Sequence, residues 1–292
     1  MAEPSVLGDV RAELGESPVW SAGENAVYWI DIRGKLIHRT DPGSGGTRSW
    51  GLPSHPGMIL LRRKGGLVVA LEDGIHAFDP ATGNLDLLVP LEAEIPENRP
   101  NDGKCDAAGR LWVGTMNKHD SDLATGGFYR IDPDLSATLI ESGLKIPNGL
   151  AWSPDGARMF RTDTRSGLVR ASGFDAATGG IWGETEFFAF DRALDGGVDG
   201  AAMDTDGGYW TAQYGVGRLR RTLPDGSAGM EIPLPVSQPT MPAFGGPGMK
   251  TLFVTSARQR LGAEALSAQP AAGALLAVET EFTGAPVGEF GG

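Results

Sequence analysis

A pattern of two apolar runs separated by a polar, glycine-containing turn recurs along the chain. In each unit the second run is centred on a large residue. The central residues are Trp29, Val68, Trp112, Phe160, Trp210 and Phe253, separated by 39, 44, 48, 50 and 43 positions. A mean spacing of about 45 residues is typical of a propeller blade with four antiparallel strands. Six such units predict an all-β, six-bladed β-propeller that forms one domain over residues 1–292.

Tight turns support this interpretation, because five of the units carry one after the next strand. They lie at 41–43, 79–83, 132–134, 175–179 and 223–226 and are rich in Asp, Pro and Gly. The stretch 262–272 could hold one or two helical turns. We expect residues 288–292, which include three glycines, to form a frayed tail.

Composition excludes several classes of protein. The 25 Lys and Arg residues against 37 Asp and Glu give a net charge of −12, which argues against nucleic-acid binding. A single cysteine, Cys105, cannot form a disulfide scaffold, and we expect it to be packed in the core. No apolar run approaches the roughly 18 residues of a membrane span, and the N-terminus lacks a signal-peptide pattern. We therefore expect a cytoplasmic protein, either a monomer or a weak homodimer, with no membrane partner.

Oxygen-bearing side chains occupy equivalent positions in four of the six units. Counting back four residues from the end of each first strand gives Glu16, Asn101, Asn148 and Asp199, whereas units two and six have about Gly57 and Met241. The innermost strand of a propeller blade lines the central channel, so these side chains should converge at one mouth. Two carboxylates and two amides favour Ca²⁺, Mg²⁺ or Mn²⁺ over structural Zn²⁺. The alternative is turn chemistry alone, since Asn-Gly and Asp-Gly often begin turns.

Arg99 lies two residues before Asn101 and should face the same mouth, where it could orient a substrate oxygen. The alternative is a surface arginine paired with Glu97 or Asp102. No nucleophile elbow, zinc-protease motif, Walker loop or dinucleotide fingerprint is present. The four histidines show no ligand spacing, and we expect turn or surface positions for His38, His55, His76 and His119.

These motifs resemble those of the SMP-30/gluconolactonase/LRE family, also called the regucalcin family. The matching segments are Leu14-Gly15-Glu16-Ser17-Pro18-Val19-Trp20, Asn98-Arg99-Pro100-Asn101-Asp102-Gly103, Ile146-Pro147-Asn148-Gly149-Leu150, and residues 28–31, 111–116, 199–200, 244–246 and 253–258. The segments run in order over nearly the whole chain, so together they are specific.

The resemblance implies a six-bladed propeller with one divalent metal in the central channel. It implies metal ligands at Glu16, Asn148 and Asp199, with Asp199 also the general base. Arg99 and Asn101 would contact the substrate. Ca²⁺ is the first choice of metal, and Mn²⁺, Mg²⁺, Fe²⁺ or Zn²⁺ are also possible. Many members of the family hydrolyse aldonolactones, so a pentono- or hexono-lactone is the expected substrate and partner.

The sequence departs from the family pattern beside two of these positions. Ser17 stands where glycine is common, and Val198 stands where proline is common. Asn117 and Asp163 are weaker candidates for substrate contact, and the loop 117–122 has no assigned role. Three other functions remain open: an esterase or organophosphate hydrolase on the same fold, a non-catalytic calcium-binding regulatory protein, and an interaction platform.

Overall fold

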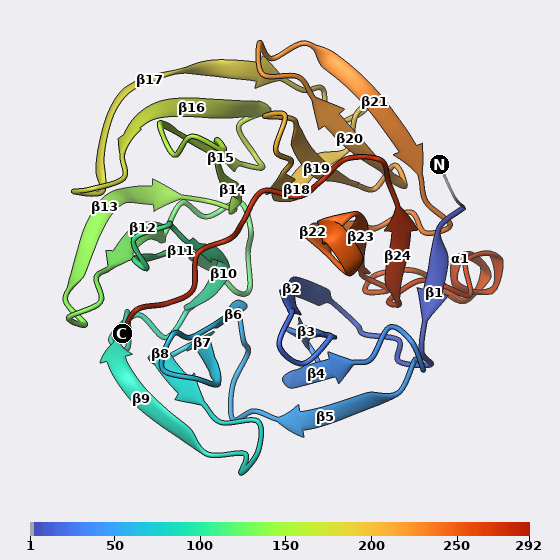
Figure 1. Ribbon diagram of the computed structural model, residues 1–292, viewed down its shortest axis with the longest axis horizontal. Helices are drawn as coiled ribbons and strands as arrows, with labels where there is room; N and C mark the ends of the chain where they lie inside the picture. Colours follow the sequence, from blue (N-terminus) through green and yellow to red (C-terminus); the bar gives the residue numbers. More distant parts are fainter. Residues whose placement is uncertain (1–2) are drawn as a thin grey trace.

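Six four-stranded antiparallel sheets stand around a central axis in the computed structural model, which describes residues 3–292 (Figure 1). The innermost strands contact one another in turn around the ring, in the order β2, β6, β10, β14, β18 and β22. The predicted six-bladed β-propeller is therefore confirmed.

The blades follow the chain in order. The first three are β2 (Gly15–Ser21), β3 (Ala26–Asp31), β4 (Leu36–Thr40) and β5 (Thr47–Gly51); β6 (Met58–Leu61), β7 (Leu67–Leu71), β8 (Gly74–Phe78) and β9 (Leu85–Pro90); and β10 (Asn98–Cys105), β11 (Leu111–Asn117), β12 (Gly126–Ile131) and β13 (Ala137–Leu144). The fourth and fifth are β14 (Pro147–Trp152), β15 (Arg158–Asp163), β16 (Leu168–Asp175) and β17 (Gly180–Ala189); and β18 (Gly197–Met203), β19 (Tyr209–Tyr214), β20 (Arg218–Thr222) and β21 (Ala228–Pro233).

The sixth blade closes the ring by combining both ends of the chain. Its strands are β22 (Pro239–Gly245), β23 (Thr251–Ser256), β24 (Leu275–Glu279) and, on the outside, the N-terminal β1 (Ser5–Leu7). Pairing of β1 with β24 joins distant parts of the chain and covers an edge that would otherwise be open. A short 3₁₀ turn (Pro247–Met249) and the helix α1 (Ala263–Ala268) complete the fold. The helix falls inside the predicted stretch 262–272. Within residues 3–292, no helix is long and apolar enough to cross a membrane.

The second strand of every blade contributes large residues to the core. All six repeat centres found in the sequence are on these strands and are at most 2 % exposed. Trp112 and Trp210 need a partner for their buried indole N–H groups, and the carboxylates of Asp106 and Asp204 accept them at 3.1 and 2.8 Å.

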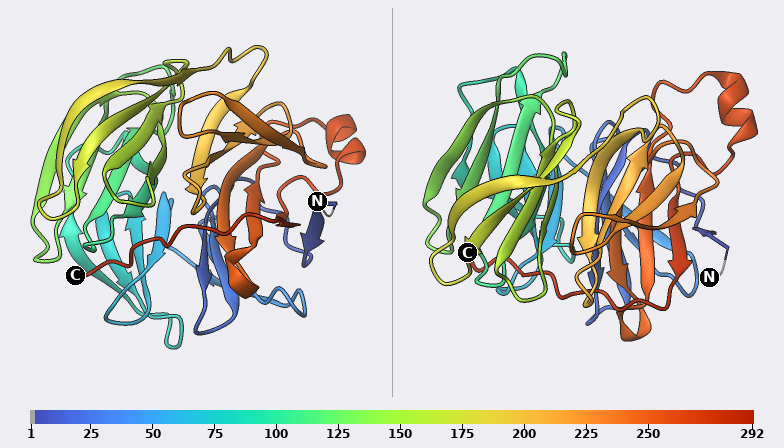
Figure 2. Two further views of the ribbon diagram at one scale, coloured as in Figure 1. Left: turned by 45° about the horizontal axis from the view of Figure 1, so that its top comes forward. Right: turned by 90° about the horizontal axis from the view of Figure 1, so that it is seen from above.

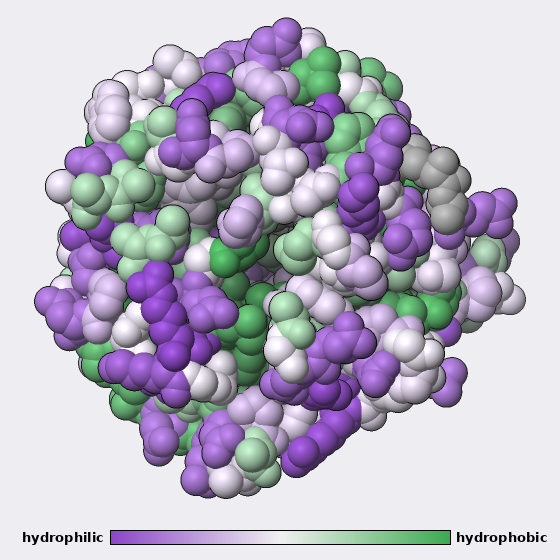
Figure 3. All heavy atoms as spheres, in the orientation of Figure 1, coloured by the Kyte–Doolittle hydropathy of each residue, from purple (hydrophilic) through white to green (hydrophobic). Residues whose placement is uncertain are grey.

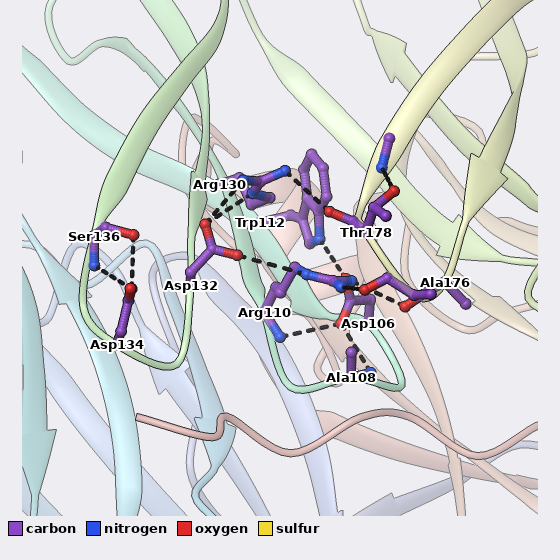
Figure 4. Close-up of polar contacts among 12 residues, drawn as sticks. Asp106, Ala108, Arg110, Trp112, Arg130, Asp132, Asp134, Ser136, Ala176 and Thr178 are labelled. Atoms are coloured by element: carbon purple, nitrogen blue, oxygen red, sulfur yellow. Dashed lines mark hydrogen bonds and ion pairs between the residues drawn. The ribbon is translucent and has the colours of Figure 1, made fainter.

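Asp106 is also the centre of a buried polar network that ties two blades together (Figure 4). It accepts a 2.9 Å hydrogen bond from the Arg110 guanidinium, which in turn donates to the backbone carbonyl of Ala176 in the next blade at 3.1 Å. The Asp-turn-Trp pattern therefore fixes both the core of a blade and its contact with a neighbour.

The expectation of a frayed C-terminus is wrong. The tail crosses one mouth of the channel (Figure 1) and makes backbone hydrogen bonds to several blades, including Ala285 N–H to Met203 O at 2.8 Å and Phe290 N–H to Leu61 O at 2.9 Å. The Phe290 side chain is fully buried in the largest core cluster. Burial of this one aromatic ring outweighs the flexibility of the glycines around it.

The tail and α1 lie on opposite sides of the molecule (Figure 2). The tail side has apolar residues gathered near its centre inside a polar rim (Figure 3). A cavity of about 950 Å³ opens there, and Trp20, Met241 and Phe244 are among its lining residues. The predicted donor residues do not line this cavity, so the candidate site lies at the other mouth.

Candidate functional site

A polar cavity of about 340 Å³ occupies the mouth away from the tail. It is lined by all five candidate site residues: Glu16, Arg99, Asn101, Asn148 and Asp199. They come from four inner strands, β2, β10, β14 and β18. The structure thus brings together side chains that are far apart in the sequence, as the repeat pattern predicts.

A β-bulge follows each of these positions. The pairing between first and second strands slips between Glu16 and Val19, between Pro100 and Gly103, between Asn148 and Ala151, and between Val198 and Ala201. A bulge bends its strand and redirects the adjacent side chains. This shared irregularity places side chains from four strands into one channel mouth.

Ser17 and Gly149 show what the bulges demand of the backbone. Their φ angles are 49° and 68°, in the left-handed region that favours glycine. Ser17 is held there because its hydroxyl donates to Ile59 O at 3.0 Å and accepts from Ile59 N–H at 2.9 Å. The departure at Ser17 therefore leaves Glu16 in the cavity wall, supported by the neighbouring blade.

Hydrogen bonds link the site residues across three blades. Arg99 Nη1 donates to Asn101 Oδ1 at 3.0 Å, and Asn101 Nδ2 donates to Asn148 Oδ1 at 2.9 Å. Asn148 Nδ2 then donates to the Thr164 hydroxyl at 3.0 Å, which donates to Val198 O at 2.8 Å. This series of hydrogen bonds ends at Val198, the residue before Asp199. It holds the Asn148 amide in the orientation in which Oδ1 faces Asn101.

The two site carboxylates lie in an unfavourable environment for negative charge. Burial raises the pKa of Glu16 well above its usual range, and the carboxylates of Asp199 and Asp102 add to the rise. Burial and the nearby Asp102 raise the pKa of Asp199 to about 8, while the Arg99 guanidinium opposes the rise. Asp102 is 8 % exposed and accepts Leu150 N–H at 3.2 Å deeper in the channel.

This donor set fits a divalent cation. Glu16 and Asp199 are close enough to repel each other, and a cation between them would offset the cost of burying both charges. Asn148 adds an amide oxygen. Residues 3–292 contain no cluster of three or more His, Cys, Asp or Glu side chains suited to a metal. A metal held here would therefore depend on amide oxygen, a hard ligand that suits Ca²⁺, Mg²⁺ or Mn²⁺.

Arg99 is 6 % exposed, so it is not the surface arginine that the sequence left open as an alternative. Besides Asn101, its Nη1 donates to Pro100 O at 2.8 Å. Burial lowers the pKa of Arg99 to about 10, and the nearby Arg33 guanidinium adds to this effect. The remaining N–H groups can donate to an oxygen in the cavity.

The weaker candidates have structural roles. Asp163 accepts the backbone N–H groups of Lys145, Ile146 and Arg165 at 2.8 to 3.1 Å, so it caps a turn. Asn117 lines the cavity, but its Oδ1 accepts the N–H groups of His119 and Asp120 and shapes the loop 117–122.

Positions 57 and 241 contribute no oxygen donor, because the channel wall is tightly packed there. A Cβ atom at Gly57 would lie 2.3 Å from the carbonyl carbon of Pro100. Met241 packs over Gly200, where a Cβ would lie 2.4 Å from the Met241 Cγ.

The histidine expectation is wrong for two residues. His38 on β4 and His76 on β8 are buried, 2 % and 5 % exposed, because both sit on inward-facing strand positions. His119 is exposed at the cavity, and His55 pairs with Glu72. Cys105 is buried as expected, and burial raises the pKa of its thiol.

The sequence did not reveal the supporting role of Thr164, the burial of the charged residues Asp102 and Lys104, or most of the cationic residues around the cavity. Thr164 follows directly after the second strand β15, so its position beside the mouth could have been read from the repeat. The cations come from several blades and meet only in the folded ring.

The fold and the site together define this chain as a six-bladed β-propeller with a polar site at one mouth of its central channel. The sequence profile of the SMP-30/Gluconolactonase/LRE-like region matches residues 14–258. The chain belongs to the SMP-30/gluconolactonase/LRE-like family.

Several relatives are similar over almost the whole chain. A 6-deoxy-6-sulfogluconolactonase from Pseudomonas putida is 38 % identical over 96 % of this chain and 95 % of its own. An L-arabinolactonase from Azospirillum brasilense is 34 % identical over 99 % of this chain and 96 % of its own. The crystal structure of a calcium-binding protein, regucalcin, from Agrobacterium tumefaciens is 31 % identical, has a TM-score of 0.93, and matches 99 % of this chain and 97 % of its own.

Proposed function

We propose that this protein is a divalent-metal-dependent lactonase that hydrolyses a sugar aldonolactone to the aldonate. The observation that carries the proposal is the cavity in which Glu16, Asn148 and Asp199 meet Arg99 and Asn101. The named lactonases among the relatives support the reaction class, and the calcium-binding relative supports a cation.

Glu16, Asn148 and Asp199 would hold the cation. When bound, it supplies Lewis-acid stabilisation for the negative charge that develops on the lactone carbonyl oxygen. Arg99 and Asn101 would donate to and accept from sugar hydroxyls. Selectivity follows from this, because a substrate that lacks a matching hydroxyl leaves buried polar groups without partners.

Asp199 would act as general base. It takes a proton from the attacking water as the water oxygen bonds to the carbonyl carbon. The ring carbon–oxygen bond then breaks, the ring oxygen is protonated, and the new carboxylic acid ionises. The net reaction consumes one water and releases one aldonate and one proton.

A pH-stat measurement of proton release tests this proposal. The protein is stripped of metal and given Ca²⁺, Mg²⁺, Mn²⁺, Fe²⁺ or Zn²⁺ one at a time, with D-xylono-, L-arabinono-, D-galactono- and D-glucono-lactones as substrates. We expect hydrolysis that requires metal and falls by at least about 100-fold in Asp199→Asn, the lower range for loss of a general base.

The matched control is Asp206→Asn, an exposed aspartate in the turn after β18, which should keep the wild-type rate. A no-protein blank corrects for spontaneous lactone opening. Near wild-type turnover in Asp199→Asn would show that the assigned base is wrong. No rate above the blank with any metal would reject the lactonase proposal. Cation binding without hydrolysis of lactones, aryl esters or phosphotriesters would then support a calcium-binding role.

A further inference from the structure

The mouth of the candidate site is strongly cationic although the protein as a whole is acidic. The cavity is lined by six Arg or Lys residues: Arg33, Arg99, Lys118, Arg165, Arg192 and Arg260. Only Glu16 and Asp199 contribute carboxylates to the same wall. A chain with a net charge of −12 therefore concentrates positive charge at the one place where its substrate would enter.

Three of these arginines lack a partner. Within residues 3–292, the side chains of Arg33, Arg192 and Arg260 make no hydrogen bond, ion pair or contact with an aromatic face. All sixteen other arginines of the described chain make at least one, for example Arg48 over Trp50 and Arg258 beside Glu13. In the part of the chain that the structure describes, the arginines without a partner thus all lie at the candidate site.

Separate connections position the three guanidinium groups. Arg33 lies in the turn between β3 and β4, Arg192 in the connection from β17 to β18, and Arg260 shortly after β23. All three are exposed, whereas Asn148 is buried, so the arginines form the rim and the oxygen donors form the floor. Arg260 has a φ of 62°, a strained conformation for a residue with a Cβ atom, and its side chain reaches the cavity from there.

The cations also affect one another. Burial is the main cause of the lowered pKa of Arg99, and the Arg33 guanidinium adds to it, so these two like charges line one cavity close enough to repel each other. Lys118 is neutralised by Glu72 at 2.7 Å and Arg165 by Asp122 at 3.1 Å. Among the described residues, no carboxylate pairs in this way with the rim arginines Arg33, Arg192 and Arg260. A neutral sugar lactone would leave this charge uncompensated.

We propose that the substrate is an anionic aldonolactone, with a sulfonate, phosphate or carboxylate on the end of the sugar opposite the lactone carbonyl. The Arg33, Arg192 and Arg260 guanidinium groups bind that anion at the rim while the carbonyl lies on the floor beside Asp199. Guanidinium groups form strong, charge-assisted hydrogen bonds with such oxyanions. The inference rests on the proposed lactonase function and specifies its substrate.

The product carboxylate does not explain the rim, because hydrolysis forms it at the carbonyl carbon on the floor. General attraction of anions is a second alternative. It would raise the association rate, and salt would abolish the preference without any dependence on which anion is present. Direct binding predicts differences among sulfonate, phosphate and carboxylate that persist at high salt.

The kinetic test compares D-glucono-1,5-lactone with its 6-phosphate, its 6-deoxy-6-sulfonate and the corresponding lactone with a terminal carboxylate. The measured quantity is the ratio of kcat/KM between each anionic lactone and the neutral one, at 50 mM and 500 mM NaCl. We expect a ratio of about tenfold or more for at least one anion, the strength of one charge-assisted contact. In the triple variant R33Q/R192Q/R260Q this ratio should fall below about threefold.

Arg48→Gln is the matched control, because Arg48 is exposed and lines the opposite cavity. It removes one positive charge away from the rim, by the same Arg-to-Gln change, and should keep the wild-type ratio. A ratio near one in the wild-type protein, a ratio unchanged in the triple variant, or a preference that vanishes entirely at 500 mM NaCl would each overturn the proposal.

A binding measurement separates this inference from the lactonase proposal. Titration calorimetry compares 1,5-anhydro-D-glucitol, which cannot be hydrolysed, with its 6-phosphate and 6-deoxy-6-sulfonate. Tighter binding of an anionic analogue that is lost in the triple variant supports the anion site even if no lactone is hydrolysed. Equal binding of the neutral and anionic analogues overturns it even if lactones are hydrolysed.

Discussion

His38 is a buried titratable residue on the face of β4 that packs against the next strand. Its ring lies 4.4 Å from that of Trp29, and its Nδ1 is 2.7 Å from the Ser49 hydroxyl. The other ring nitrogen, Nε2, is buried and has no partner within the described residues. Burial lowers the pKa of His38 to about 4, so the fold requires the neutral form of this ring.

The first prediction concerns the pH dependence of stability. Between pH 4 and pH 6.5 the unfolded chain binds a proton at His38 and the folded protein does not, so the free energy of unfolding falls as the pH is lowered through this range. From pH 7 to pH 5 the wild-type protein should lose about 2 kcal/mol more than His38→Gln. Urea denaturation at both pH values measures the difference.

The control for this experiment is His119→Gln, because His119 is exposed at the cavity. It should follow the wild-type protein at both pH values. If His38→Gln lost as much stability on acidification as the wild type, the neutral, buried state of His38 would not be a determinant of acid sensitivity.

At the scale of elements, the bulged inner strands do not position the site alone. Thr164, which follows the second strand β15, makes hydrogen bonds to two of them. Its hydroxyl joins Asn148 on β14 to the backbone of Val198 on β18, and these positions adjoin Gly149 and Asp199. Tyr209 supports the same region by donating to Gly149 O at 2.6 Å. The amide orientation at one blade is thereby coupled to the carboxylate at the next.

Thr164→Val tests this coupling. Valine has a similar shape but cannot bond to Asn148 or Val198, so the amide oxygen loses its fixed orientation. Loss of a residue that orients a metal ligand typically lowers metal affinity by about 10- to 100-fold, and we expect a loss in this range with the fold retained. Calorimetric titration of the metal-free protein with Ca²⁺ or Mn²⁺ measures it, and circular dichroism checks the fold.

Thr164→Ser keeps the hydroxyl and should restore most of the affinity. An affinity in Thr164→Val equal to that of the wild type would rule out a positioning role for this hydroxyl. Equal losses in the valine and serine variants would show that the threonine methyl group, which valine keeps and serine lacks, is needed as well as the hydroxyl.

The repeat explains which elements could be predicted from sequence. Residues such as Trp29, Trp112 and Trp210 recur because the middle of each second strand is buried, so the period is visible in the order of apolar and polar residues. The oxygen donors could also be predicted, because Glu16, Asn148 and Asp199 each lie four residues before the predicted end of their first strand. Three-residue β1 was not predicted, because its residues are exposed or half-buried and their place is set by pairing with β24. The burial of His38 could have been predicted, since this residue follows the apolar Ile37 on a strand in the interior of its blade.

At the scale of the whole molecule, the two mouths of the channel differ in character. One carries oxygen donors and arginines, and the other has an apolar cavity crossed by the C-terminal tail. The rim arginines could not be inferred from the sequence because Arg33, Arg192 and Arg260 occupy connections without a shared pattern. Their grouping depends on the closed ring, which brings distant blades to one axis. We propose that all six blades unfold as one domain, with the tail as part of the closure.

Phe290→Ala tests whether the tail holds the ring together. The side chain is fully buried with residues of the second and third blades, including Leu60 and Cys105, and the tail also bonds to the fifth blade through Ala285. Truncation of a buried phenylalanine costs about 3–5 kcal/mol, and the tail would also lose its anchor. We expect a loss of that size in urea denaturation, with a single transition in wild type and variant.

Val287→Ala, on a side chain that is 47 % exposed in the same tail, should change stability by less than about 0.5 kcal/mol. A loss below about 1 kcal/mol in Phe290→Ala, smaller than an ordinary buried truncation, would show that the tail lies on the blades without stabilising the ring.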